Sequence, residues 1–137
     1  MKTSARNELT GKVIDVKSGA VVSEVKVEVS KDIVISATIT NESKENLALK
    51  IGDEISALIK SSSIILAKSD LKTSARNSIL GNIKEIIKGA VNSEVIISVG
   101  ENTLCAVVTN ESVQGLELKV GTSVNAIFKA SSVILIA

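Results

Sequence analysis

The sequence contains no histidine, tryptophan or tyrosine, and only one cysteine and one phenylalanine among its 137 residues. Without histidine it lacks both the commonest general base and the commonest transition-metal ligand. The single cysteine excludes an internal disulfide bond and fits a reducing compartment such as the cytoplasm. Because Cys105 stands in the apolar run 104–108, we expect a buried thiol rather than a reactive one. These absences argue against an enzyme and against a zinc or iron site.

The near absence of aromatic residues also bears on nucleic-acid binding. Proteins that hold single-stranded nucleic acid stack its bases on aromatic side chains, and Phe128 is the only aromatic residue here. The formal net charge is +1 with no block of basic residues, so the electrostatic attraction that DNA binding requires is missing as well. We therefore expect no nucleic-acid partner.

Long apolar runs are missing too. No run approaches the roughly 20 residues of a membrane-spanning helix, and the polar stretch 2–8 does not resemble a signal peptide. Hydrophobic residues nevertheless make up 45% of the chain, which is too apolar for a disordered protein. We expect a folded cytoplasmic protein with no membrane partner.

What the sequence does contain is a duplication. The string Thr-Ser-Ala-Arg-Asn at 3–7 returns unchanged at 73–77, an offset of 70 residues. Past position 100 the offset falls to 69, so that Thr-Asn-Glu-Ser at 40–43 aligns with the same string at 109–112. Other strings follow the same alignment: Gly-Ala-Val at 19–21 and 89–91, and Ser-Glu-Val at 23–25 and 93–95. Two copies of one module therefore fill the chain, and any site should occur twice.

We expect a first repeat over residues 1–68 and a second over 69–137. Modules of this size bury too small a fraction of their surface to be stable alone. The junction 68–72 is also too short for a free linker. We therefore expect the repeats to contact each other and further copies of the chain.

Within each repeat the polarity of the side chains alternates with a period of two. The pattern predicts half-buried strands over 21–29 and 33–39, joined by a hairpin turn at Lys31-Asp32. The equivalent turn of the second repeat is expected at residues 100–102. It would be one residue shorter, because the offset between the repeats falls by one there. Weaker strands are expected over 9–16, 55–59 and 64–66, and a short helix over 41–47 capped by Thr40 or Asn41. The predicted fold class is all-β: two tandem OB-like five-stranded β-barrel repeats, each with one short helix.

Several polar residues recur at equivalent places in the two repeats, and all of them are hydrogen-bond donors. They are Ser4/Ser74 and Arg6/Arg76 before the first strand, Thr40/Thr109 at the helix start, and Lys60/Lys129 followed by 61–63 or 130–132. No carboxylate recurs next to the arginine string. Arginine, lysine and hydroxyl donors without an acceptor are suited to a fully deprotonated oxyanion. The same residues have a structural interpretation as caps and solvated surface groups, because duplication also copies neutral residues.

The order and spacing of the repeated strings resemble the molbindin (Mop) family. The strings are Thr-Ser-Ala-Arg-Asn followed by Gly, residues 88–95, Thr-Asn-Glu-Ser, Lys-Val-Gly, and residues 126–134. The resemblance covers both copies and implies a two-repeat (di-Mop) protein with a Mop/TOBE-type barrel in each repeat. It implies molybdate or tungstate as the ligand, no cofactor, and pockets between repeats and subunits of a homotrimer.

The resemblance also implies the ligand positions. They are Ser4, Arg6, Thr40, Lys60 and Ser61 in the first copy, and Ser74, Arg76, Thr109, Lys129 and Ala130 in the second. A second class of anion site would use the loops Gly19, Ala20, Val21 and Gly89, Ala90, Val91. The implied function is storage and homeostasis of molybdate or tungstate; the alternative is a free-standing molybdate sensor that acts through a protein partner.

Overall fold

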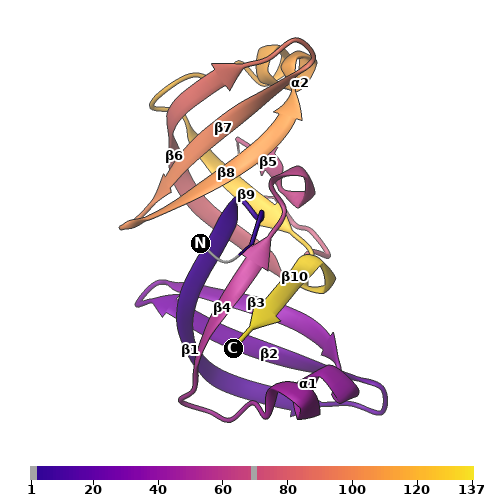
Figure 1. Ribbon diagram of the computed structural model, residues 1–137. Helices are drawn as coiled ribbons and strands as arrows, with labels where there is room; N and C mark the ends of the chain where they lie inside the picture. The colour runs from indigo at the N-terminus through magenta and orange to yellow at the C-terminus, as the bar shows by residue number, and fades with distance from the viewer. Residues whose placement is uncertain (1–2, 69–70) are drawn as a thin grey trace. The chain divides into compact units, whose positions relative to one another are not determined.

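The structure is a computed structural model that describes residues 3–68 and 71–137 (Figure 1). Each repeat contributes five strands, one short α-helix and one turn of 3₁₀ helix. The first repeat holds β1 Asn7–Ser18, β2 Val22–Ser30, β3 Ile33–Thr40, α1 Asn41–Leu47, β4 Glu54–Ile59, η1 Ser61–Ser63 and β5 Ile65–Ala67. The second repeat holds β6 Asn77–Lys88, β7 Asn92–Val99, β8 Asn102–Thr109, α2 Asn110–Gly115, β9 Ser123–Phe128, η2 Ala130–Ser132 and β10 Val133–Ile136.

The strands form two five-stranded sheets, and each sheet takes its fifth strand from the other repeat. One sheet has the order β10-β4-β1-β2-β3 and the other the order β5-β9-β6-β7-β8. β10 pairs with β4 in antiparallel register, with Val133 opposite Ile59. β5 pairs with β9, with Ile65 opposite Ile127. The last strand of each repeat thus completes the sheet of the other repeat.

The compact units follow this exchange. Unit 1 comprises the described residues of 1–7 together with 60–128 apart from 69–70, and unit 2 comprises 8–59 and 129–137. The predicted fold class is confirmed, since the chain consists mostly of strands in two curled five-stranded sheets with two short helices. The sequence repeats and the compact units therefore divide the chain at different residues. Residues 69–70 of the predicted junction lie outside the described residues.

The alternation read from the sequence sets the core of each unit. In unit 2, Val25, Val27, Ile35 and Ala37 are fully buried on facing strands. In unit 1 the corresponding positions Val95, Ile97, Leu104 and Ala106 are buried in the same way. The predicted first strand is present but longer, because β1 extends over twelve residues. Ser36 breaks the predicted alternation, because the three consecutive positions 35 to 37 of β3 are all buried.

The predicted difference between the two hairpin turns is wrong. Lys31-Asp32 is the two-residue turn that the sequence predicts, but the equivalent turn, Gly100-Glu101, also has two residues. The extra residue of the first repeat lies in β2, where the pairing with β3 shifts between Glu28 and Ser30. It is a β-bulge, which lets a strand absorb one residue without changing the turn.

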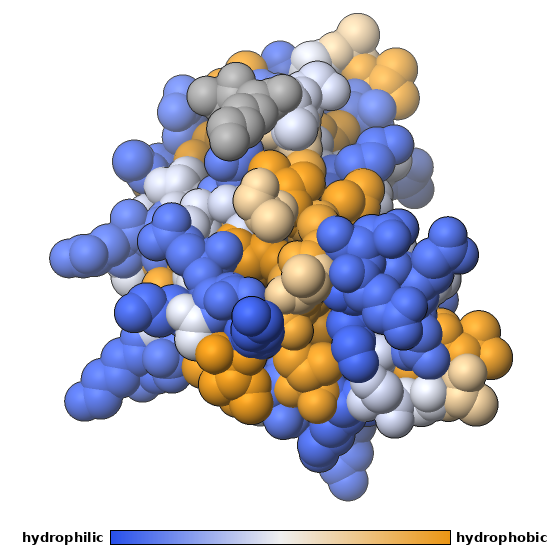
Figure 2. Space-filling model, turned by 60° about the horizontal axis from the view of Figure 1, so that its bottom comes forward, coloured by the Kyte–Doolittle hydropathy of each residue, from blue (hydrophilic) through white to orange (hydrophobic). Residues whose placement is uncertain are grey.

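The helices are short and their starts are the predicted ones. Thr40 caps α1 and Thr109 caps α2, each through a side-chain oxygen that accepts a backbone N–H. Neither helix among the described residues has the length and apolar character that crossing a membrane would require. Apolar side chains also reach the surface, as Figure 2 shows for one face of the molecule.

Candidate functional site

Segment 3–7 is fixed to the edge of the sheet in unit 1. The order of that sheet ends at β8, so one side of β8 has no further strand to pair with. There the side-chain amide of Asn7 acts in place of a strand: its Nδ2 donates to the carbonyl oxygen of Cys105 (2.9 Å) and its Oδ1 accepts from the amide of Cys105 (2.7 Å). Both residues are buried. The recurring asparagine thus positions the residues that precede it.

Arg6 lies next to this anchor and forms an ion pair. Its Nη1 donates to Oε1 of Glu94, which is on β7. The hydrogen bond to Glu94 raises the pKa of the Arg6 guanidinium above its ordinary value, so that Arg6 is charged throughout the physiological range. Burial raises the pKa of the Cys105 thiol, and the positive charge of Arg6 acts in the opposite direction. The expectation that Cys105 is buried is confirmed.

Lys60 and Ser61 reach the same strand from the other end of the first repeat. Lys60 has extended backbone angles and precedes η1, which packs against β8. The first N–H groups of a helical turn have no partner within the turn, so they can donate hydrogen bonds to a bound anion. The side chain of Lys60 is exposed. Unit 1 therefore brings Arg6, Lys60 and Ser61 onto segments that pack against β7 and β8.

Unit 2 repeats only one part of this arrangement, the lysine and the 3₁₀ turn that follows it. Lys129 precedes η2, which packs against β3 as η1 does against β8. Lys129 is exposed, and Ala130 is buried. Ser74 and Arg76 are exposed residues that precede β6 and belong to unit 1. The predicted positions thus divide between the units: Thr40, Lys129 and Ala130 lie in unit 2 and the other seven in unit 1.

Thr40 and Thr109 each cap the start of a helix. Oγ1 of Thr109 accepts from the amide of Ser112 (3.1 Å) and shares a hydrogen bond with its Oγ (2.7 Å). Oγ1 of Thr40 accepts from the amide of Ser43 (3.0 Å) and donates to its Oγ (2.8 Å). Both hydroxyls are therefore engaged in capping, which is the structural interpretation that the sequence left open.

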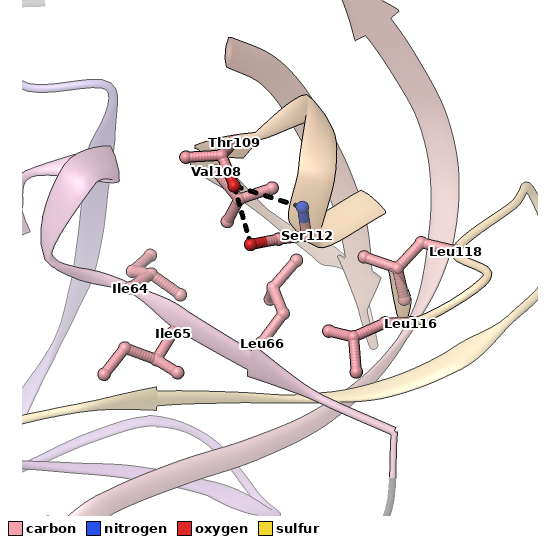
Figure 3. Close-up of a pocket in the computed structure, with 8 residues that line it drawn as sticks. All are labelled: Ile64, Ile65, Leu66, Val108, Thr109, Ser112, Leu116 and Leu118. Atoms are coloured by element: carbon pink, nitrogen blue, oxygen red, sulfur yellow. Dashed lines mark hydrogen bonds between the residues drawn. The ribbon is translucent and has the colours of Figure 1, made fainter. Parts of the chain in front are cut away.

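Beside each capping threonine lies an apolar pocket. In unit 1 it has a volume of about 210 Å³, between the segment 64–66 on one side and α2 with its flanks on the other (Figure 3). In unit 2 the equivalent pocket of about 470 Å³ lies between α1 and the segment 133–135. The threonine and serine of the cap are the polar groups at each rim. These pockets contain no charged side chain among their lining residues.

The Gly-Ala-Val loops are fastened to the helix starts. In unit 2 the side chain of Asn41 donates to the carbonyl of Gly19 (3.0 Å), and its amide donates to the carbonyl of Val21 (3.0 Å). The buried hydroxyl of Ser23 donates to Oδ1 of Asn41. Asn110 makes the same three contacts, with Gly89, Val91 and Ser93. Most of the strings retained in both repeats therefore have a structural explanation.

Val21 and Val91 stand out from these loops. Each exposes 70% of its surface. Gly19, Ala20, Gly89 and Ala90 are also exposed. The loops thus present small and apolar side chains with no charged donor of their own.

Sequence reasoning missed Glu94. No carboxylate recurs beside the arginine string, whereas Glu94 reaches Arg6 from a position 88 residues away in the sequence. The repeated string Ser-Glu-Val was the available signal, because Glu94 and Glu24 are its only charged members. In the part of the chain that the structure describes, no group of three or more histidine, cysteine, aspartate or glutamate residues could hold a metal ion.

Fold and site together define a duplicated small β-barrel module whose recurring side chains include several hydrogen-bond donors. The TOBE domain family matches residues 3–66 and 73–135, which are the two repeats. The chain therefore belongs to the TOBE domain family, as a two-repeat protein of the molbindin (Mop) type.

A solved structure of ModG, described as a cytoplasmic molybdate-binding protein with molybdate bound, matches with a TM-score of 0.94 and 39% identity, covering 98% of both chains. The molybdenum transport protein ModE of Azotobacter vinelandii is 44% identical over 138 residues, which cover 98% of this chain and 51% of ModE. The molybdenum-pterin-binding protein MopA of Rhodobacter capsulatus is 38% identical, covering 98% of this chain and 52% of MopA. This chain thus spans about half the length of these two relatives.

Proposed function

We propose that this protein binds molybdate and tungstate. The observation that supports this most strongly is its likeness to ModG, which extends over the whole length of both chains at 39% identity and in a structure with molybdate bound. The donor set of the chain agrees with such a ligand. Arginine and lysine side chains, hydroxyls and the N–H groups of a helical turn all donate, and molybdate offers four oxygens that only accept.

The proposed ligand residues are those that the resemblance implies. In the first copy they are Ser4, Arg6, Thr40, Lys60 and Ser61, and in the second Ser74, Arg76, Thr109, Lys129 and Ala130. Arg6, Lys60 and Lys129 have the clearest support, since no core contact or cap requires their charge. Ala130 can contribute only its backbone N–H. Thr40 and Thr109 would have to exchange their hydrogen bonds with Ser43 and Ser112 for bonds to the anion.

We propose further that the chain forms a homotrimer, with a second class of anion site at the loops 19–21 and 89–91. Support comes from apolar side chains that are exposed at equivalent positions of both repeats: Val21 and Val91, Ile51 and Val120, Ile65 and Ile134. Exposed apolar residues on small modules favour burial against further copies. Ile65 and Ile134 also line the pockets beside Thr109 and Thr40, respectively.

The proposed role is storage and homeostasis of the anion in the cytoplasm, as a binding protein and not an enzyme, with the anion as ligand and no cofactor. ModG is described as cytoplasmic. A second role, sensing the anion and signalling through a protein partner, is supported by the 34% identity with the transcriptional regulator ModE of Yersinia pestis, of which this chain covers 52%. The two roles differ in whether the loaded chain binds another protein.

Native mass spectrometry of the chain purified from cells grown with molybdate tests the proposal. We expect a mass of about three chains of 14.3 kDa each with bound molybdate, and loss of the anion on denaturation. A chain that carries no molybdate and takes none up from solution would contradict the proposed function.

A further inference from the structure

Glu94 is placed where the core does not require it. It lies on β7, and its neighbours Ser93 and Val95 are buried in unit 1. Because side chains alternate along a strand, Glu94 points to the opposite face. There it meets Arg6, which arrives from a segment outside the sheet.

The stability of the fold does not explain this ion pair. The side chains of Arg6 and Glu94 are 48% and 32% exposed, and exposed ion pairs contribute little to folding. The segment is already held by the buried hydrogen bonds between Asn7 and Cys105. The effect of the ion pair is to fix the position of the Arg6 guanidinium.

Arg6 is held at both ends of its side chain. Asn7 fixes the backbone next to it, and Glu94 holds Nη1 of its head group. A guanidinium has five N–H donors in a rigid plane, so Nη2 and Nε remain for an anion once Nη1 is engaged. A free arginine would lose the freedom of its rotamers on binding, and an arginine already held loses less.

We propose that Glu94 is a positioning residue for the anion: it holds the Arg6 guanidinium by one edge and leaves the remaining N–H groups directed at the oxyanion. This inference rests on the proposed function. It explains why Ser-Glu-Val is retained at 23–25 and 93–95, although Lys26 and Glu28 of the same strand correspond to Ile96 and Ser98. Glu24 holds the equivalent position of the other repeat.

The test compares the molybdate affinity of Glu94→Ala and Glu94→Gln by isothermal titration. Alanine releases Arg6, whereas the amide oxygen of glutamine still accepts from Nη1. Since only one of the two copies is changed, we expect Glu94→Ala to give a biphasic isotherm in which half of the sites bind about tenfold more weakly. Glu94→Gln should remain within about threefold of the wild type, because the hydrogen bond to Arg6 persists.

Two controls test whether the effect of Glu94→Ala on affinity comes from the position of Arg6. The alternatives are a disturbed structure and the loss of one negative charge. Glu85→Ala removes a carboxylate from the neighbouring strand β6, where Glu85 is exposed, and should bind as the wild type does. Adding Glu94→Ala to Arg6→Ala should cause no further loss, because a residue that acts through Arg6 has nothing left to position.

The outcomes are distinct. If Glu94→Ala binds molybdate as tightly as the wild type, or more tightly, the inference is wrong while the proposed function stands. Equal losses in Glu94→Ala and Glu94→Gln would also overturn it, because the charge and not the orientation would then matter. If the wild-type chain binds neither molybdate nor tungstate, the proposed function fails and the inference with it.

Discussion

Gly11 on β1 and Gly81 on β6 are required by the neighbouring strands. A Cβ on Gly11 would lie 2.2 Å from the carbonyl oxygen of Glu28, and one on Gly81 would lie 2.6 Å from that of Ser98. Both obstacles are backbone atoms, which cannot move without separating the strands. A close approach of two backbones, and not conformational freedom, explains these glycines.

We therefore expect Gly11→Ala to lower the free energy of unfolding by about 1–3 kcal/mol, as other overpacked positions do. Gly115→Ala is the matched control, because no atom lies within 4 Å of the added Cβ. That variant should change stability by less than about 0.5 kcal/mol. Urea denaturation measures both, and equal effects would show that crowding at β2 is not the cause.

Arg6 and Lys60 supply the charged donors of the proposed site. Arg6→Ala or Lys60→Ala should lower the affinity for molybdate by about 1.5–3 kcal/mol each, or roughly ten- to hundredfold, because each removes a charge-assisted hydrogen bond. Arg76→Ala and Lys129→Ala should behave alike in the other copy.

Isothermal titration measures these affinities. Lys84→Ala is the matched control, since Lys84 is an exposed lysine of β6 outside the proposed site. Unaltered binding by Arg6→Ala/Arg76→Ala would rule out the assignment of both arginines.

At the scale of elements, each helix start is tied to the loop before β2 or β7 through one asparagine. Asn41→Ala would remove the nearer of the two partners of the buried Ser23 hydroxyl, the other being Ser18, and also the donor to Gly19. We expect a loss of about 1–3 kcal/mol in unfolding free energy, since buried polar groups lose their partners. Asn46→Ala, at an exposed position of the same helix, should cost less than about 0.5 kcal/mol. A stability assay that finds no difference between the two would contradict the structural role of Asn41.

Local patterns predicted the elements well, for reasons that the structure makes plain. The alternation over 21–29 and 33–39 reflects burial on one face of β2 and β3, and Thr40 starts α1 because its side chain caps the helix. The bulge in β2 was not predictable, because the same one-residue offset between the repeats fits a longer turn equally well.

Contacts between distant segments could not be read from the sequence. The exchange of β5 and β10 depends on which barrel each strand joins, and both barrels present nearly the same edge to pair with. The contact between Arg6 and Glu94 spans 88 residues and follows from that tertiary arrangement. The candidate ligand positions came from a family resemblance, whereas their support by Glu94 came only from the structure.

At the scale of the whole molecule, the exchange makes unit 2 depend on the end of the chain. A chain that ends at Phe128 lacks β10, and with it the buried side chains Val133 and Leu135. We expect its residues 8–59 to lose hydrogen-exchange protection while 77–128 keep it, because unit 1 retains all of its strands. A synthetic peptide of residues 129–137 should restore protection, and a scrambled peptide should not. Uniform protection in the shortened chain would show that β10 is dispensable.

Selectivity depends on all the donors of the proposed site together. Molybdate and tungstate are fully deprotonated at neutral pH, whereas phosphate keeps a proton that needs an acceptor. The proposed ligand residues include no carboxylate, so such a proton would remain unpaired at a cost of about 1–3 kcal/mol. Sulfate is a bare dianion, but its shorter bonds leave some donors out of reach.

Competition against bound molybdate should therefore rank tungstate first, sulfate far behind and phosphate weakest. Equilibrium dialysis with labelled molybdate gives this order directly. If phosphate displaced molybdate as readily as tungstate does, the site would have to offer a free acceptor for the phosphate proton.

The exchanged strands also set the order in which the protein can form during synthesis. A ribosome synthesises the first repeat long before residues 129–137, so unit 2 cannot close its sheet until those residues have been made. Unit 1 needs both segment 3–7 and β9, so it too must wait until most of the second repeat has been synthesised. Neither half of the duplicated sequence therefore supplies all five strands of a sheet, and each repeat can complete its sheet only with the last strand of the other.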